Sequence, residues 1–206
     1  NLTLFMVKCL AGYSRSVMLK NANVFLVGFS GSGKSTIGRK LARKLRVQFY
    51  DTDQIIEQAA GKSIPRIFDE DGEETFRHLE EQAVEGIVKR RLHSKGVALG
   101  GGAFENKRTR GLLSQSGVVI YLSCAQDELL QRISRLPARP KLRVQGGMDA
   151  KKSRVVLRER MKSLLAKRQK NYKTAHLTFS TTGKDPDKST TELKSKLVRM
   201  YARNSR

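Results

Sequence analysis

Eight residues, Gly28 to Ser35, carry the clearest chemical signal in this chain. They read GFSGSGKS and supply the glycine, lysine and serine positions of a complete P-loop. Glycines let backbone N–H groups surround a phosphate, and the start of the following helix presents further N–H groups and the positive end of its dipole. Lys34 adds a positive charge near the β and γ phosphates, and the Ser35 hydroxyl suits a magnesium ion. The motif therefore predicts a site for the phosphates of a nucleotide.

A DTD sequence, Asp51 to Asp53, is the second candidate. It follows the strand-like run 47–50. Because ligands of open α/β sheets gather outside the carboxyl ends of the strands, both carboxylates should lie beside the P-loop. One can hold magnesium through water, and the other can accept hydrogen bonds from a substrate alcohol or take its proton. The alternative is that the pair only ends a strand and caps the next helix.

An arginine–glutamate pair and a run of glycines complete the chemical candidates. Arg77 and Glu80 share one helix face, so the carboxylate can orient the guanidinium, although a surface ion pair worth under about 1 kcal/mol is the alternative. Gly100 to Gly102 follow the strand-like run 97–99. Three glycines let the backbone touch a ligand closely, and a plain flexible loop explains them equally well.

Five short apolar runs must position these residues. They cover 24–27, 47–50, 96–99, 118–122 and 177–179, and longer helix-like or polar stretches separate them. This alternation predicts an α/β fold in which helices cover both faces of a parallel sheet. The clearest helices are expected directly after the P-loop, at 37–45, and over 72–91, 125–136 and 153–175. The apolar stripe expected in the second of these is Phe76, Leu79, Ala83, Ile87 and Val88.

Composition places the chain among globular proteins. Its 206 residues suit one domain, and no stretch approaches the 18 or so apolar residues that a membrane helix needs. Two cysteines make a disulfide framework unexpected and fit a reducing cytoplasm. The net charge of +22 is concentrated after residue 80. It indicates either a nucleic-acid footprint or a solvated basic face on an enzyme with anionic substrates, and the second is favoured because aromatic residues are sparse among the basic ones.

Residues 1–22 are interpreted separately. They contain no acidic residue, which can mark a transit peptide. Their apolar part precedes the basic residues, however, and a native start near Met18 is an alternative. We therefore expect a cytoplasmic protein, with organellar targeting as the less favoured interpretation.

The motifs together resemble the shikimate kinase family, within the P-loop nucleoside-monophosphate-kinase-like group. GFSGSGKST, DTD, IFDEDGEETFRHLE, LGGGA, ARP and AKRQKNY occur in that order between about Asn23 and Tyr201. The resemblance implies a three-layer sandwich with a central five-stranded parallel sheet and a mobile lid at about 137–152. One kinase domain, 23–206, would follow an extension, 1–22. The implied activity is ATP-dependent phosphorylation of the 3-hydroxyl of shikimate, a step in chorismate and aromatic amino-acid biosynthesis, by a monomer.

The same resemblance implies roles for individual residues. Lys34, Asp53 and Arg139 would be catalytic, and Ser35 and Asp51 would serve Mg²⁺. ATP would contact nine residues: Gly31, Ser32, Gly33, Lys34, Ser35, Thr36, Arg132, Arg139 and Lys184. Shikimate would contact Asp53, Phe68, Phe76, Arg77, Glu80, Gly100, Gly101, Gly102 and Arg168. In this set Arg77 and Arg168 would clasp the carboxylate, because forked guanidinium groups match that geometry.

Three departures from the family and two alternative functions remain. The lid and the helix after it carry more positive charge than is usual in the family, and the extension before Asn23 has no counterpart in the short bacterial forms. Lys141 stands in the predicted lid, in the sequence RPKLR, where the family usually has an apolar residue. A kinase of another small acid, such as gluconate, would share the P-loop without predicting the later motifs. A catalytically quiet protein that binds nucleic acid through its basic second half is the other alternative, and the intact Lys34, Asp51, Asp53 and Arg139 argue against it.

Overall fold

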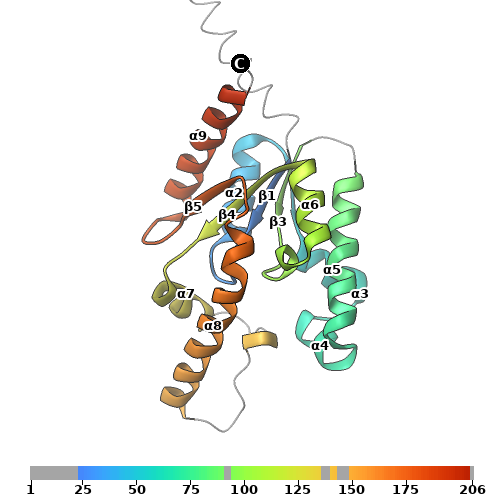
Figure 1. Cartoon of the computed structure of the whole chain (residues 1–206), viewed down its shortest axis with the longest axis vertical. Helices are drawn as coiled ribbons and strands as arrows, with labels where there is room; N and C mark the ends of the chain where they lie inside the picture. The colour runs from blue at the N-terminus through green and yellow to red at the C-terminus, as the bar shows by residue number, and fades with distance from the viewer. Residues whose placement is uncertain (1–22, 91–93, 136–139, 143–148, 205–206) are drawn as a thin grey trace, which may run out of the picture.

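The protein is described by a computed structural model that covers residues 23–90, 94–135, 140–142 and 149–204 (Figure 1). Its centre is a sheet of five parallel strands in the order β2-β3-β1-β4-β5. The strands are β1 (Asn23–Val27), β2 (Gln48–Asp51), β3 (Lys95–Ala98), β4 (Gly117–Ser123) and β5 (Leu177–Ser180). The predicted parallel α/β sheet is therefore confirmed, and each strand lies within about one residue of the expected run.

Helices cover both faces of this sheet. In Figure 1, α2 (Lys34–Leu45) and α9 (Pro186–Asn204) lie on one side, and α5 (Gly72–Lys89) and α6 (Lys107–Ser116) lie on the other. The remaining elements are α3 (Thr52–Ala60), α4 (Ile64–Glu70), α7 (Gln126–Ile133), α8 (Ala150–Tyr172) and the short 3₁₀ helices η2 (Ala103–Glu105) and η3 (Pro140–Leu142).

The core follows from the alternation of side chains along the central strands. In β1, Phe25 and Val27 face the cluster formed with α5 and α6, whereas Val24 and Leu26 face the cluster formed with α2 and α9. Because both faces are buried, the strand reads as a continuous apolar run. Two smaller clusters join α7, η3 and α8, and α3, α4 and α5. These satellite clusters hold the elements that surround the site.

Helix α5 differs from its predicted pattern. It ends at Lys89, and its buried residues are Phe76, Glu80, Val84 and Ile87, while Leu79 and Ala83 are only partly buried. The residues of the expected stripe are all buried or packed against a core cluster, but the stripe omitted the buried Glu80 and Val84. The helix turns the carboxylate of Glu80 inward.

The boundaries of α8 and of the predicted lid also differ from expectation. Helix α8 begins at Ala150, with Asp149 as its N-cap, so the last residues of the predicted lid, 137–152, are helical. Its buried residues, Met161, Leu165, Arg168 and Tyr172, all lie in its second half. Arg139 lies outside the described residues.

Candidate active site

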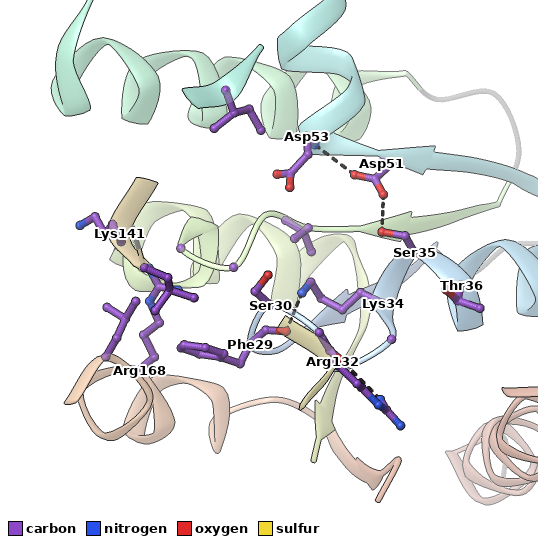
Figure 2. A pocket seen from close by; sticks show the side chains of 18 of the residues that line it. Phe29, Ser30, Lys34, Ser35, Thr36, Asp51, Asp53, Arg132, Lys141 and Arg168 are labelled. Carbon is purple, nitrogen blue, oxygen red and sulfur yellow. Dashed lines mark hydrogen bonds between the residues drawn. The ribbon is translucent and has the colours of Figure 1, made fainter. Parts of the chain in front are cut away.

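A cavity of about 550 Å³ opens at the carboxyl ends of β1, β2 and β3 (Figure 2). Most of the predicted site residues line it: Gly31, Gly33, Lys34, Ser35, Thr36, Asp51, Asp53, Phe68, Phe76, Arg77, Glu80, Gly101, Gly102, Arg132, Arg168 and Lys184. Ser32 and Gly100 are predicted residues that lie behind this lining, and both are buried. The fold thus gathers residues from distant parts of the chain around one cavity.

The P-loop occupies one end of the cavity and leads into α2. Gly33 caps the helix with φ of 95°, a left-handed conformation that a glycine adopts without strain. The Lys34 ammonium donates to the carbonyl oxygen of Phe29 at 3.0 Å and lies over the loop. No acidic residue occupies the first turn of α2, so the N–H groups at its start and its dipole favour an anion. This end of the cavity can hold phosphates.

Asp51 ties the P-loop helix to the end of β2. Its carboxylate accepts a hydrogen bond from the Ser35 hydroxyl at 2.6 Å and caps α3 by accepting from the backbone N–H of Asp53 at 3.1 Å. The side chains of Ser35 and Asp51 therefore lie together beside Lys34 (Figure 2). Hydroxyl and carboxylate oxygens are ligands that suit Mg²⁺, so Ser35 and Asp51 fit this ion.

Arg132 and a loop after β5 border the cavity on the side of α7. The guanidinium of Arg132 donates to the carbonyl oxygen of Gly31 at 3.1 Å and pairs with Glu128 one helical turn earlier. Glu128 also accepts from the backbone N–H of Gly183 at 2.9 Å, which lowers the pKa of its carboxyl. Lys184, next in the chain, pairs with Glu192 at 2.6 Å. The Glu128 carboxylate thus connects α7 directly to the loop after β5 and, through Arg132, to the P-loop.

The glycine turn 100–102 forms the floor of the opposite end. A Cβ at Gly100 would lie 2.5 Å from Oε1 of Glu80 and 2.8 Å from Oδ1 of Asp53. A Cβ at Gly102 would lie 2.5 Å from Nη1 of Arg77. The backbone of this turn is therefore in close contact with the side chains predicted to bind an acid. A residue larger than glycine would displace these side chains.

Glu80 is the buried charge of this end. Its carboxylate pairs with Arg77 through Oε2, while Oε1 has no hydrogen-bond partner among the described residues. Burial raises the pKa of Glu80 above its ordinary value, and the neighbouring Arg77 only partly counteracts this. The arrangement holds Arg77 against the glycine turn.

Arg168 reaches the same end from α8. Its side chain is only 7% exposed, its guanidinium lies 5.7 Å from the centre of the Phe29 ring, and its Nε has no hydrogen-bond partner among the described residues. A buried guanidinium with an unused donor is a ready partner for an anion. Arg77 and Arg168 thus bring two positive groups to the glycine turn.

Several supporting residues were not found by sequence reasoning. The buried Thr52 accepts from the backbone N–H of Gly100 at 2.8 Å, and the Tyr172 hydroxyl donates to the carbonyl oxygen of Gly101 at 2.5 Å. Burial raises the pKa of Tyr172, so this donor keeps its proton. Tyr172 lies one helical turn after Arg168, a spacing that could have identified it. Glu128 gave no comparable signal.

Comparison with known proteins adds the family. A family model described as shikimate kinase matches residues 30–198. This chain belongs to the shikimate kinase family. The shikimate kinase of Chlorobium chlorochromatii is 42% identical over 176 residues, which are 85% of this chain and 90% of that protein. The structure of the Acinetobacter baumannii shikimate kinase in complex with shikimate has a TM-score of 0.77 and 31% identity, and the match covers 92% of this chain and 98% of that one.

The family resemblance is therefore confirmed, and the chain is an enzyme of the kinase class. A gluconokinase from Sinorhizobium meliloti has a TM-score of 0.53 at 13% identity, with 90% of this chain and 98% of that one covered, so it shares the fold alone. Within the described residues, none of the helices combines the length and apolarity that crossing a membrane requires.

Proposed function

We propose that the chain transfers the γ-phosphoryl group of ATP to the 3-hydroxyl of shikimate, giving shikimate 3-phosphate and ADP. The product belongs to the route to chorismate and the aromatic amino acids. The observation that carries this proposal is the composition of one cavity, which has a P-loop at one end and Arg77, Arg168 and a glycine turn at the other. That a relative of the same fold and family holds shikimate supports it.

The acid would bind by its carboxylate. Arg168 has an unused buried donor and Arg77 is held by Glu80, so the two guanidinium groups can grip a carboxylate with little loss of side-chain entropy. Phe68 and Phe76, whose ring centres are 4.6 Å apart, would pack against the ring of the acid. Gly100, Gly101 and Gly102 would let that ring lie close to the backbone.

Asp53 would orient the acceptor hydroxyl and take its proton. It lies across the cavity from Lys34 (Figure 2), and its Oδ1 atom lies beside the glycine turn, 2.8 Å from the position of a Cβ at Gly100. Lys34, with Gly31, Ser32, Gly33 and Thr36 of the loop and first turn, would hold the phosphates. Phosphoryl transfer asks chiefly for such positioning and for neutralisation of the oxygens that gain charge.

Ser35 and Asp51 would hold Mg²⁺ with the nucleotide. The ion would neutralise charge on the β and γ phosphate oxygens. The hydrogen bond of 2.6 Å between the two side chains supports this assignment, because it brings both oxygen ligands to one place. Arg132 and Lys184 would border the adenine.

Some assignments rest on the resemblance alone. We retain Arg139 as the residue that contacts the transferring phosphoryl group, 137–152 as the lid, and 23–206 as one kinase domain preceded by 1–22. A monomer in the cytoplasm also stays a proposal.

ADP release tests the function directly. Purified protein with ATP and Mg²⁺ is offered shikimate, gluconate or a nucleoside monophosphate. Turnover with shikimate alone is the expected result. Among the three acceptors only shikimate combines a carboxylate with a ring that suits the acid end, the part of the cavity formed by Arg77, Arg168 and the glycine turn. Turnover with gluconate alone would transfer the assignment to a sister activity, and no turnover with any acceptor would refute kinase function.

A further inference from the structure

A lysine from η3 reaches across the acid end of the cavity. Leu142, the last residue of η3, is buried among residues of α7 and α8. Lys141 lines the cavity, and its ammonium contacts the carboxylate of Glu73 in the first turn of α5. Figure 2 shows Lys141 and Arg168 on the same side of the cavity. The Lys141–Glu73 pair therefore connects the wall formed by α7 and α8 to the helix that carries Arg77.

Glu73 is shared between two cations. Its Oε1 atom contacts Lys141 and also accepts from Nε of Arg77 at 3.3 Å. The contact with Lys141 is the main cause that holds the pKa of Glu73 below its ordinary value. Arg77 is thereby placed between two carboxylates, Glu73 on its Nε side and Glu80 on its Nη1 side.

The charge balance at this end depends on Lys141. Three carboxylates, those of Asp53, Glu73 and Glu80, lie near the positions that an acid would occupy, against the guanidinium groups of Arg77 and Arg168 and the ammonium of Lys141. Among these six groups the formal charges cancel before an acid arrives. Without Lys141 these groups would carry a net negative charge. That charge would repel an approaching acid, which is itself an anion.

We propose, on the basis of the function proposed above, that Lys141 is a positioning and specificity-determining residue for the carboxylic acid. By pairing with Glu73 it offsets a negative charge that would repel the acid and compete with it for Arg77. Lys141 thus acts through Glu73 and Arg77 and sets the affinity of the enzyme for its anionic acceptor.

A double-mutant cycle tests this role. Lys141→Met, Glu73→Gln, Lys141→Met/Glu73→Gln and Lys141→Arg are compared with the wild type by steady-state kinetics, and circular dichroism establishes that each variant is folded. Lys141→Met should raise the KM for shikimate about three- to fivefold, the range expected for a half-exposed charge pair. The KM for ATP should change less than twofold, and kcat should change less than the KM for shikimate.

The remaining variants separate charge balance from simple packing. Glu73→Gln should not raise the KM for shikimate, and adding it to Lys141→Met should return that KM to near the wild-type value. Lys141→Arg should keep the wild-type KM. Lys89→Met is the matched control. Lys89 pairs with Glu85 at 3.1 Å in the last turns of α5, the helix that carries Glu73, and does not line the cavity.

Failure of this inference differs from failure of the function. An unchanged KM for shikimate in Lys141→Met, or a double variant no better than the single one, would overturn the role of Lys141 while leaving an active shikimate kinase. Absence of shikimate phosphorylation by the wild type would instead refute the proposed function.

Discussion

Glu80 shows how one residue combines a structural cost with a use. Its side chain is 4% exposed, and one carboxylate oxygen has no hydrogen-bond partner among the described residues. Burying a charged carboxylate is unfavourable unless it is paired, and here the partner is Arg77. The cost is accepted at a position that holds a guanidinium against the glycine turn, so we interpret Glu80 as a residue kept for the site and not for stability.

The raised pKa of Glu80 predicts a pH-dependent stability. A carboxyl whose pKa is higher in the folded state contributes stability that is fully present below its unfolded pKa and is lost as the pH rises through the folded pKa. Glu80→Gln removes this titration. Between about pH 4 and pH 7 the melting temperature of Glu80→Gln should therefore rise relative to the wild type, by about 2–4 °C for each 1 kcal/mol of changed stability.

Thermal unfolding followed by circular dichroism across this pH range measures the difference. Parallel pH profiles for the two proteins would contradict the prediction. The same variant should raise the KM for shikimate, because Arg77 loses the charged partner that orients it.

The turn between β3 and η2 is the element on which the acid end is built. Side chains from α3, α5 and α8 converge on its three glycines, and Thr52 and Tyr172 bond its backbone. Such close contact requires the absence of Cβ atoms, as at Gly100. The turn therefore transmits any change of its own shape to several site residues at once.

Gly100→Ala tests this dependence on backbone contact. The added methyl group would force Glu80 or Asp53 to move, so we expect the KM for shikimate to rise at least about tenfold and the stability to fall by about 1–3 kcal/mol. Gly111→Ala is the matched control. Gly111 lies in α6, and apart from its chain neighbours and the backbone of its own helix no described atom lies within 4 Å of the added Cβ, so this change should leave the kinetics intact and stabilise the helix by about 0.5–1 kcal/mol.

Helix α7 would play the corresponding role for the nucleotide in the proposed function. Glu128 connects Arg132 with the backbone of Gly183, so Glu128→Ala should free both and raise the KM for ATP about three- to tenfold. The KM for shikimate should change less than twofold. Asp127→Ala, one residue earlier and paired with Arg158 outside the cavity, is the control for lost negative charge on α7. An equal effect of both variants would refute a specific role for Glu128.

For the whole molecule, the parts that the sequence predicts are those with local causes. The five strands were found because each contains a short apolar run, although the edge strands β2 and β5 are only partly buried. The P-loop was found because its residue spacing is specific to phosphate binding. Helices α3, α4, α6 and α9 were not identified. The first three are short, and α6 contains Gly111 and depends on the side chain of Asn106, which accepts from two backbone N–H groups at its start. Helix α9 spans 19 residues and was missed although the buried Leu193 and Leu197 lie one turn apart in it.

The remaining features depend on contacts between distant residues. The spacing from Arg168 puts Tyr172 on the same helix face, but its hydrogen bond to the carbonyl oxygen of Gly101 depends on how α8 packs on the sheet. The inward position of Glu80 likewise depends on how α5 packs. Residue roles in the site were therefore predicted through a family resemblance, and the geometry of their support required the structure. The interpretation of the excess charge as a solvated basic face stays a prediction.

The uneven burial of α8 has a consequence for local opening of the chain. None of residues 151–160, all of which are described, is buried, and Figure 1 shows the first turns of this helix extending beyond the sheet. The second half contains Met161, Leu165, Arg168 and Tyr172 in its packed face. Opening the first half exposes little apolar surface, so its backbone amides should exchange with deuterium much faster than those of 162–172.

Hydrogen–deuterium exchange with mass spectrometry can resolve the two halves as separate peptides. We expect added shikimate to slow exchange in the second half far more than in the first. Uniform exchange along α8 would contradict this expectation. With the expected result, one continuous helix consists of a rigid segment that presents Arg168 and a loosely held segment that opens and closes without disturbing it.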